Sequence, residues 1–368
     1  MRGAVSRSGA LGGKCDSGRN GRLPSTHDRI ATMSHRQGVR EPTLRPSPPQ
    51  DGITDGDVVL HFTTEDHMNP LREFDAVIVG GGPAGLSAAL VLGRARRSVL
   101  VIDHGRPANA VSHGVGGLLG QAAVDPVALR ATGREQLARH PTVEVCDDEV
   151  AGIDRRGGGF VVDLERRGDV RASAVVLAHG LRYDPPPLAG IDELWGRSVF
   201  HCAFCDGWEV RDLPLALHGR GPAAARSALV LASWSDDVVL CSDGPFVGDR
   251  AALASAGVRI REEPIRRLVG SAGHLERIEF EHGPSELRDA LFVSTRRGQP
   301  NDLAGTLGCE LTDAGTIVTD VDGRTSVSGV YAVGDAATAH SRSVANAIGT
   351  GSRAAYSLVL DRVPALAA

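Results

Sequence analysis

The sequence predicts an α/β protein with two Rossmann-like nucleotide-binding domains and added β-meander strands. The run DAVIVG, GGPAGLSAALVLGRARR, SVLVID gives a short apolar strand, a glycine loop opening a helix, and a second strand near residue 75. The run PLALHGRGPAAARSALVLAS, followed by DDVVLCSDG, repeats this order from residue 214. Strand-like runs such as GGFVVDL and RIEFE follow the two units. Two such units with different flanking strands imply two nucleotide-binding domains.

Length and composition exclude several functional classes. The chain has 368 residues, enough for two or three domains, and 42% of them are hydrophobic. Its formal net charge is −5, and residues 73–368 contain no strong basic block, so nucleic acid is not an expected partner. The sequence contains no run of about 18 apolar residues, so it predicts no membrane-spanning helix. We expect a cytoplasmic protein.

Residues 1–72 differ in composition from the rest of the chain. They are rich in Arg, Ser, Gly and Pro and show no sustained periodicity, which predicts a disordered extension. All three methionines, Met1, Met33 and Met68, lie here, so an assigned start that is too early is the simplest explanation. An Arg-rich transit peptide is the alternative.

The first glycine loop has the pattern G-x-G-x-x-G between a strand and a helix, as dinucleotide binding requires. The first glycine permits the tight turn, the second lets the backbone approach a pyrophosphate, and the third lets the helix pack on the sheet. The helix N-terminus offers N–H donors to phosphate. Asp103 ends the next strand, placed to accept hydrogen bonds from ribose hydroxyls. The predicted loop residues are Gly80, Gly82, Pro83, Ala84 and Gly85.

A second candidate cofactor contact lies near the C-terminus, in GVYAVGD. This run places Gly334 and Asp335 at the end of an apolar strand. A carboxylate there could accept hydrogen bonds from the ribityl hydroxyls of a flavin. A plain turn is the alternative, since Gly and Asp are common turn residues.

The segment HCAFCDGWE carries two cysteines, Cys202 and Cys205, followed by Asp206. A zinc site needs four ligands, and this is the only close pair among six cysteines. A static disulfide across two residues closes a very small loop and stabilises little. The residues therefore favour a redox pair, because C-x-x-C spacing can lower a thiolate pKa. Asp206 is an available acid/base, with helix capping as its alternative role.

Together, GGGPAGLSAAL, CAFCDG and TSVSGVYAVGDAA resemble the low-molecular-weight thioredoxin reductases, over about residues 74–368. The resemblance implies an FAD-binding domain formed by residues 73–185 and 295–368. It implies an NAD(P)-binding-like domain at 186–294, inserted into the first and carrying the cysteine pair. A homodimer and a thioredoxin-like partner are also implied.

The resemblance assigns roles to particular residues. Cys205 is expected to face the flavin, Cys202 to exchange with the substrate, and Asp206 to move the proton. Gly334 and Asp335 are expected to contact the flavin chain. A helix that starts near Ser343 and Val344 is expected to point its N-terminus at the isoalloxazine ring; the family usually has Gln where this chain has Ser343.

The second glycine loop departs from the thioredoxin reductase pattern. It contains Gly219 and Gly221 but has Ala224 at the third place, and the arginine cluster that binds the 2′-phosphate of NADPH is missing. Asp243 stands where it would repel that phosphate. The second domain is therefore expected to bind NADH, to bind a nucleotide weakly, or to bind none.

The segments FHCAFCDGWEV and ASWSDDVVL also resemble a side branch of the family, the FAD-dependent dithiol oxidases of gliotoxin- and holomycin-type compounds. Members of that branch commonly have Pro where this chain has Ala203. Three functions stay open: a reductase passing electrons from NAD(P)H to a disulfide such as that of thioredoxin, an oxidase closing a disulfide in a small dithiol with oxygen as acceptor, and a flavin-binding redox sensor.

Overall fold

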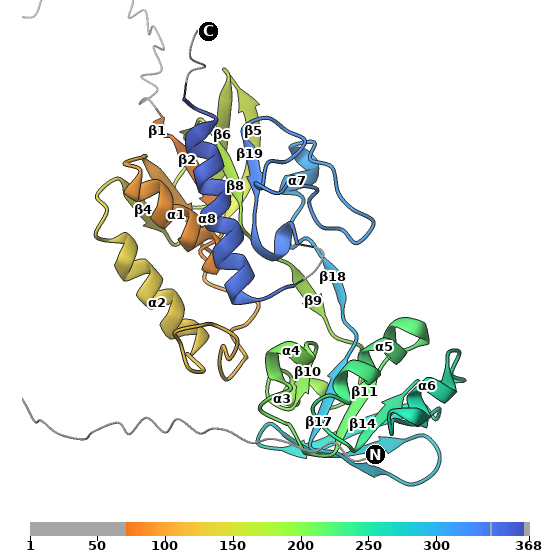
Figure 1. Cartoon of the computed structure of the whole chain (residues 1–368). Helices are drawn as coiled ribbons and strands as arrows, with labels where there is room; N and C mark the ends of the chain where they lie inside the picture. Colours follow the sequence, from red (N-terminus) through yellow and green to blue (C-terminus); the bar gives the residue numbers. More distant parts are fainter. Residues whose placement is uncertain (1–70, 339–340, 364–368) are drawn as a thin grey trace, which may run out of the picture. The chain divides into compact units, whose positions relative to one another are not determined.

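The computed structural model describes residues 71–338 and 341–363 (Figure 1). The predicted N-terminal extension lies outside this range except for its last two residues, and the first strand begins at Arg72. Two parallel sheets dominate the architecture, which confirms the predicted α/β class with two Rossmann-like units. None of the helices in the described ranges combines the length and apolar character needed to cross a membrane.

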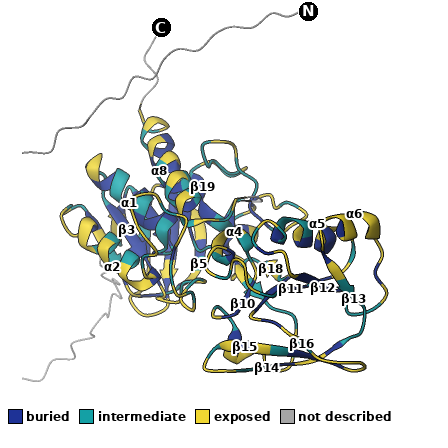
Figure 2. Cartoon of the chain, turned by 60° about the horizontal axis from the view of Figure 1, so that its bottom comes forward, coloured by how far each residue is buried: buried dark blue, intermediate teal, exposed yellow. Residues whose placement is uncertain are grey.

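The first parallel sheet has five strands in the order β19-β8-β2-β3-β4. Their bounds are Val330–Ala332 for β19, Val175–Leu177 for β8, Ala76–Val79 for β2, Val99–Ile102 for β3 and Val143–Cys146 for β4. The residues of β2 and β3 are apolar, mostly β-branched and buried, as expected for strands covered on both faces (Figure 2). Strand β19 joins this sheet after a long excursion of the chain, so the sheet is built from two separate sequence segments.

Three helices accompany this sheet: α1 (Pro83–Arg94), α2 (Pro126–Leu137) and α8 (Val344–Leu360). Helices α1 and α8 lie side by side and share one apolar cluster with the sheet (Figure 1). Asp125 caps α2, its carboxylate accepting from the N–H groups of Val127 and Ala128 at 2.8 and 2.9 Å. Pro126 is the first helical residue, and an aspartate cap followed by proline is a common sequence signal for a helix start.

A second, mixed sheet supports the first. Its order is β1-β7-β6-β5, with β1 parallel to β7 and the other pairs antiparallel. The bounds are Arg72–Phe74 for β1, Val150–Arg156 for β5, Gly159–Leu164 for β6 and Val170–Ala172 for β7. These strands share a core cluster with the first parallel sheet.

The second parallel sheet has the order β10-β17-β11-β12-β13. The bounds are Val199–Phe200 for β10, Leu215–His218 for β11, Val238–Cys241 for β12, Arg259–Arg261 for β13 and Ala290–Val293 for β17. Helices α5 (Gly221–Leu231) and α6 (Arg250–Ser255) pack on it. An antiparallel meander adjoins it, formed by β14 (Ile265–Ser271), β15 (His274–Phe280) and β16 (Glu286–Leu287).

Two short strands, β9 (Arg182–Asp184) and β18 (Arg296–Gly298), pair antiparallel where the chain leaves for the second parallel sheet and returns from it (Figure 1). The remaining elements are α3 (Ile191–Leu194), α4 (Ala203–Asp206), α7 (Leu303–Thr306) and the 3₁₀ turn η1 (Gly334–Ala336). Helix α4 carries the cysteine pair, and η1 carries the C-terminal Gly-Asp.

Candidate active site

The first glycine loop connects the carboxyl end of β2 to α1. Gly80 has φ +111°, a backbone conformation that L side chains rarely adopt, and its N–H donates to the carbonyl of Ile102 at 2.7 Å. A Cβ on Gly85 would lie 1.9 Å from the carbonyl oxygen of Gly80, so this position excludes any side chain. Gly82 is the N-cap of α1 and has open space around it, and no side chain caps the helix. The N-terminus of this twelve-residue helix thus lacks a side-chain cap.

Asp103 follows β3 at the same edge of the sheet and is buried. One carboxylate oxygen accepts from the Gly105 N–H at 3.0 Å, and the other accepts from Arg130 and Arg134 at 2.8 and 2.7 Å. Burial alone would raise the pKa of Asp103, but these hydrogen bonds hold it below its ordinary value. A Cβ on Gly81 would lie 2.4 Å from this carboxylate, so the acid touches the glycine loop. The Asp103 carboxylate therefore lies where it could accept hydrogen bonds from a ribose. Its pairing with Arg130 and Arg134 was not predicted from the sequence.

The buried polar groups at this edge fit a dinucleotide cofactor. His179 follows β8, and its Nε2 is a buried atom without a hydrogen-bond partner in the structure. Burial lowers the pKa of His179 to about 4, so the ring is neutral at pH 7. Its Cα is 3.0 Å from a Cβ built on Gly80. An unsatisfied imidazole nitrogen, a glycine cradle and an uncapped helix N-terminus together match a polar, phosphate-containing ligand.

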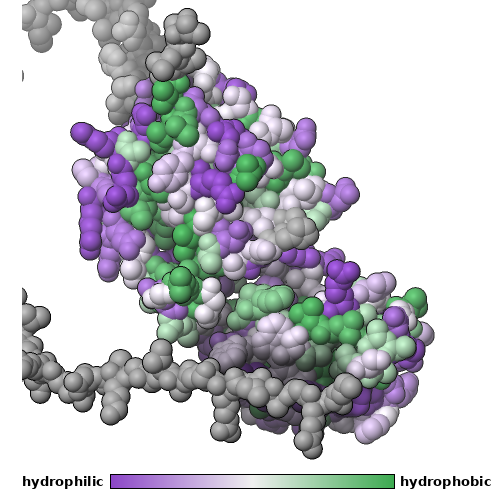
Figure 3. Space-filling view, in the orientation of Figure 1, coloured by the Kyte–Doolittle hydropathy of each residue, from purple (hydrophilic) through white to green (hydrophobic). Residues whose placement is uncertain are grey.

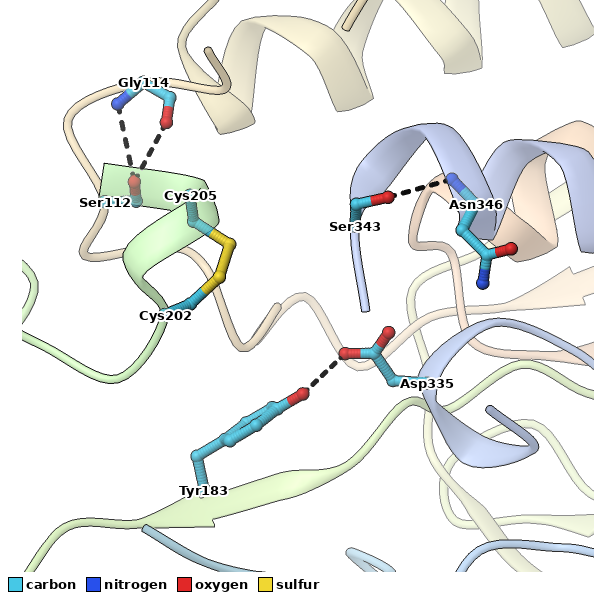
Figure 4. The surroundings of a disulfide bond; sticks show 8 residues. All are labelled: Ser112, Gly114, Tyr183, Cys202, Cys205, Asp335, Ser343 and Asn346. Carbon is cyan, nitrogen blue, oxygen red and sulfur yellow. Dashed lines mark hydrogen bonds between the residues drawn. A yellow bond between two sulfur atoms is a disulfide. The ribbon is translucent and has the colours of Figure 1, made fainter. Parts of the chain in front are cut away.

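The C-terminal Gly-Asp lies in η1, directly after β19. The Tyr183 hydroxyl donates to the Asp335 carboxylate at 2.7 Å (Figure 4). Burial raises the pKa of Asp335, and the bond from Tyr183 opposes that rise. Ser343 is the N-cap of α8, accepting from the Asn346 N–H at 3.1 Å, so Val344 begins the helix as predicted.

Helix α4 presents the cysteine pair. Cys202 is its N-cap and is bonded to Cys205, with the two Cα atoms 5.3 Å apart (Figure 4). Cys202 is half-buried and Cys205 is exposed. Asp206 ends this single turn; burial, with Glu209 as a second cause, raises the pKa of its carboxyl to about 7. A carboxyl with that pKa next to a disulfide can both give and accept a proton near neutral pH.

The other three described cysteines are free, buried thiols. They are Cys146, Cys241 and Cys309, whereas Cys15 lies outside the described residues.

The second glycine loop connects β11 to α5. Gly219 follows β11, and Gly221, with φ +71°, opens α5. The Arg220 side chain crosses to Asp243, at the end of β12, with Nη2 2.5 Å from the carboxylate. The same nitrogen donates to the Asp243 carbonyl. Asp243 thus lies just after the strand that follows the loop, and it is paired with a cation from the loop itself.

The structure therefore groups the predicted residues into three places: the edge that holds the first loop, Asp103 and Asp335; helix α4; and the second loop. Sequence reasoning missed Tyr183, His179 and the two arginines on Asp103. Arg130 and Arg134 are four residues apart on α2, and this spacing was the one available signal that both face the same way.

These features, two Rossmann-like units and a disulfide-bonded Cys-x-x-Cys pair, define a disulfide oxidoreductase. Residues 74–351 match the family model "Pyridine nucleotide-disulphide oxidoreductase". The chain belongs to this family and is a thioredoxin-reductase-like disulfide oxidoreductase.

Curated and solved relatives agree with the assignment. A probable thioredoxin reductase of Arthroderma benhamiae is 30% identical over 329 residues, covering 80% of this chain and 81% of the relative. Thioredoxin reductase tcpT of Claviceps purpurea is 32% identical over 285 residues, covering 73% and 88%. The crystal structure of HlmI matches with a TM-score of 0.74 and 39% identity, covering 78% of this chain and 93% of that one.

Proposed function

We propose that this enzyme holds FAD and passes electron pairs between it and the Cys202–Cys205 disulfide. The FAD domain would comprise residues 73–185 and 295–368, and the NAD(P)-binding-like domain 186–294. The supporting observation is the edge of the first parallel sheet, where the glycine loop, Asp103 and the unsatisfied His179 Nε2 meet. Bound FAD would supply a centre that takes up and releases two electrons.

Each residue group has a proposed role. The loop from Gly80 to Gly85 binds the pyrophosphate, and Asp103 accepts from the ribose. Asp335, oriented by Tyr183, accepts from the ribityl chain, with Gly334 beside it. The N-terminus of α8, at Ser343 and Val344, faces the isoalloxazine ring.

In the reductase direction the Cys202–Cys205 bond breaks and takes up two electrons and two protons. The Cys202 thiolate then attacks one sulfur of a substrate disulfide and forms a mixed disulfide. Cys205 attacks Cys202, which restores the enzyme disulfide and releases the substrate as a dithiol. Asp206 accepts or returns the proton at each thiol, which its pKa of about 7 allows. A thioredoxin-like protein is the proposed disulfide substrate, and a homodimer the proposed assembly.

One observation favours a second direction, oxidation of a small dithiol with oxygen as final acceptor. The Arg220–Asp243 ion pair spans the second glycine loop, where the ribose of a nicotinamide cofactor would need the Asp243 carboxylate. A nucleotide must break this pair to bind in that manner. In this direction the same sulfur steps run in reverse.

An anaerobic titration tests the proposal. The protein is loaded with FAD, and flavin absorbance near about 450 nm is followed while NADPH, NADH or a small dithiol is added to separate samples. Bleaching by stoichiometric nicotinamide supports the reductase direction. Bleaching only by the dithiol, with recovery in air, supports the oxidase. No FAD binding, or no bleaching by any donor, contradicts the proposed function.

A further inference from the structure

Two exposed aromatic residues lie next to the cysteine pair in the sequence. Phe204 stands between the two cysteines and is 80% exposed, and Trp208, three residues after Cys205, is 66% exposed. Apolar residues gather on this face, over α4 and α5 (Figure 3). Leaving two large rings in water forgoes the free energy of burying them, on the order of 2 kcal/mol for each. We name Phe204, Trp208, Trp234 and Arg211 the aromatic platform.

The two exposed rings of the platform, Phe204 and Trp208, are each held in place by a neighbouring side chain. Trp234 meets Phe204 edge to face, with ring centroids 5.5 Å apart and planes at 89°. Gly207 lies against Trp234, because a Cβ on Gly207 would be 3.0 Å from Trp234 Cδ2. Edge-to-face packing fixes the tilt of Phe204 and leaves its free face open.

The side chain of Arg211 stacks on the Trp208 ring. The Arg211 guanidinium carbon lies 4.0 Å from the centroid of the Trp208 ring, and its Nη1 donates to the Trp208 carbonyl at 2.6 Å. A guanidinium stacked this way orients an indole and adds a cationic edge to the surface. Rings that are oriented before binding lose less entropy when a ligand covers them.

The position of the platform beside the cysteines limits which substrates can contact it. Disulfide exchange requires a substrate sulfur in line with a cysteine sulfur of α4, so any substrate must lie against the same single helical turn. Two exposed rings offer far less area than the roughly 800 Å² per partner of a stable protein interface. They suit a small ligand that places a flat ring on the platform while its sulfurs reach the cysteines.

We propose that Phe204 and Trp208 select small dithiol or disulfide substrates that carry an aromatic ring. This inference rests on the second, dithiol-oxidising direction of the proposed function and names its substrate class; a thioredoxin-like protein belongs to the reductase direction. On binding a dithiol, two S–H groups are lost and a substrate disulfide forms. The two electrons and two protons reduce the Cys202–Cys205 bond to a dithiol. This dithiol would close again to the disulfide by passing its electron pair and a proton to bound FAD, and the second proton would go to solvent.

Two matched dithiols test the proposal: 1,2-benzenedimethanethiol and butane-1,4-dithiol. Both close six-membered cyclic disulfides, and only the first has an aromatic ring. Each is mixed anaerobically with FAD-loaded enzyme, and the second-order rate constant of flavin bleaching is measured by stopped flow. In Phe204→Ala and Trp208→Ala the ratio of the aromatic to the aliphatic rate constant should fall about tenfold, a loss of roughly 1.4 kcal/mol of discrimination. Because each variant is compared with wild type, any difference in intrinsic reactivity between the two dithiols cancels.

Tyr356→Ala is the control, since Tyr356 is another exposed aromatic residue, on α8, and its loss should leave the ratio unchanged. Phe204→Leu, which keeps an apolar side chain, guards against a folding defect and should also lower the ratio. A ratio unchanged in all platform variants overturns the proposal. The proposal is also overturned, in favour of a protein partner, if the platform variants lose more of the wild-type rate of thioredoxin reduction than of the wild-type rate of aromatic dithiol oxidation. If neither dithiol bleaches wild-type flavin, the dithiol direction of the proposed function fails instead.

Discussion

The Tyr183 hydroxyl donates a 2.7 Å hydrogen bond to the Asp335 carboxylate, joining β9 to η1 (Figure 4). The two residues are 152 positions apart in the sequence. Burial raises the pKa of Asp335, and the bond from Tyr183 counteracts this. If Asp335 binds the ribityl chain, the hydrogen bond from Tyr183 orients its carboxylate and favours its ionised form.

Tyr183→Phe should therefore weaken FAD binding. Removing a hydrogen bond to a carboxylate costs about 1.5 kcal/mol or more, so the Kd for FAD should rise about tenfold. Titration calorimetry with the apoprotein measures the Kd, and the flavin midpoint potential should shift in the same variant. Tyr356→Phe on α8 is the matched control. Equal affinity and potential in wild type and Tyr183→Phe would show that Asp335 does not act on the cofactor.

Asp206→Asn should remove a pH-dependent step. The pKa of Asp206 is about 7, so the carboxyl is increasingly able to accept a proton as pH rises through 7. Wild-type dithiol oxidation should accelerate across that range, and the variant should lose this dependence and be about 100-fold slower. The measurement is a pH–rate profile from pH 5.5 to 8.5 for both proteins. The profile of Asp206→Asn gives the pH dependence that comes from ionisation of the substrate thiols, and this dependence is subtracted from the wild-type profile. A profile that keeps its transition near pH 7 in the variant assigns the transition to another group.

The same substitution has a predicted effect on stability. The folded-state pKa of Asp206 lies above the ordinary value of 3.8, so the folded protein binds more protons than the unfolded chain between about pH 4 and pH 7. This contribution therefore favours folding at low pH and is lost as pH rises through 7. Asp206→Asn should have a higher Tm than wild type at pH 8, and this advantage should shrink toward pH 5. Thermal unfolding at both pH values measures it, and a lower Tm at pH 8 would contradict burial as the cause of the shift.

Single cysteine substitutions should separate the two sulfurs. If Cys205 faces the flavin, Cys202→Ser leaves a thiolate beside it, and a long-wavelength charge-transfer absorbance should develop as pH rises. Cys205→Ser should lack this band but keep a thiol that labels readily with an alkylating reagent. Absorbance spectra of the two FAD-loaded variants decide the matter. A band in Cys205→Ser alone would reverse the two roles.

Asp243→Asn should change the use of nicotinamide cofactors. Removing the carboxylate releases Arg220 from its ion pair and removes a charge that repels a 2′-phosphate. The ratio of NADPH- to NADH-driven flavin bleaching should rise at least tenfold, about 1.4 kcal/mol. Asp236→Asn removes an equal charge from an exposed position and serves as the control. No change in the ratio would mean that nucleotides do not reach this loop.

The glycine loops, the cysteine pair and the strand-end acids were predictable because each depends on a local pattern. A loop glycine follows its strand directly, and α2 begins at the cap and proline that its sequence predicts. The pairs Tyr183–Asp335 and Arg220–Asp243 were not predictable, because each joins segments that come together only when sheets form. The ring contacts of Phe204 with Trp234 likewise depend on the packing of α4 beside the end of α5.

The most direct test of the account counts electrons in an anaerobic dithionite titration of FAD-loaded enzyme. The Cys202–Cys205 disulfide is a two-electron couple in exchange with the flavin. Wild type should therefore take up one more two-electron equivalent before full bleaching than the Cys202→Ser/Cys205→Ser double variant. Equal uptake by the two proteins would show that the cysteine pair does not exchange electrons with the flavin, and would contradict the proposed function.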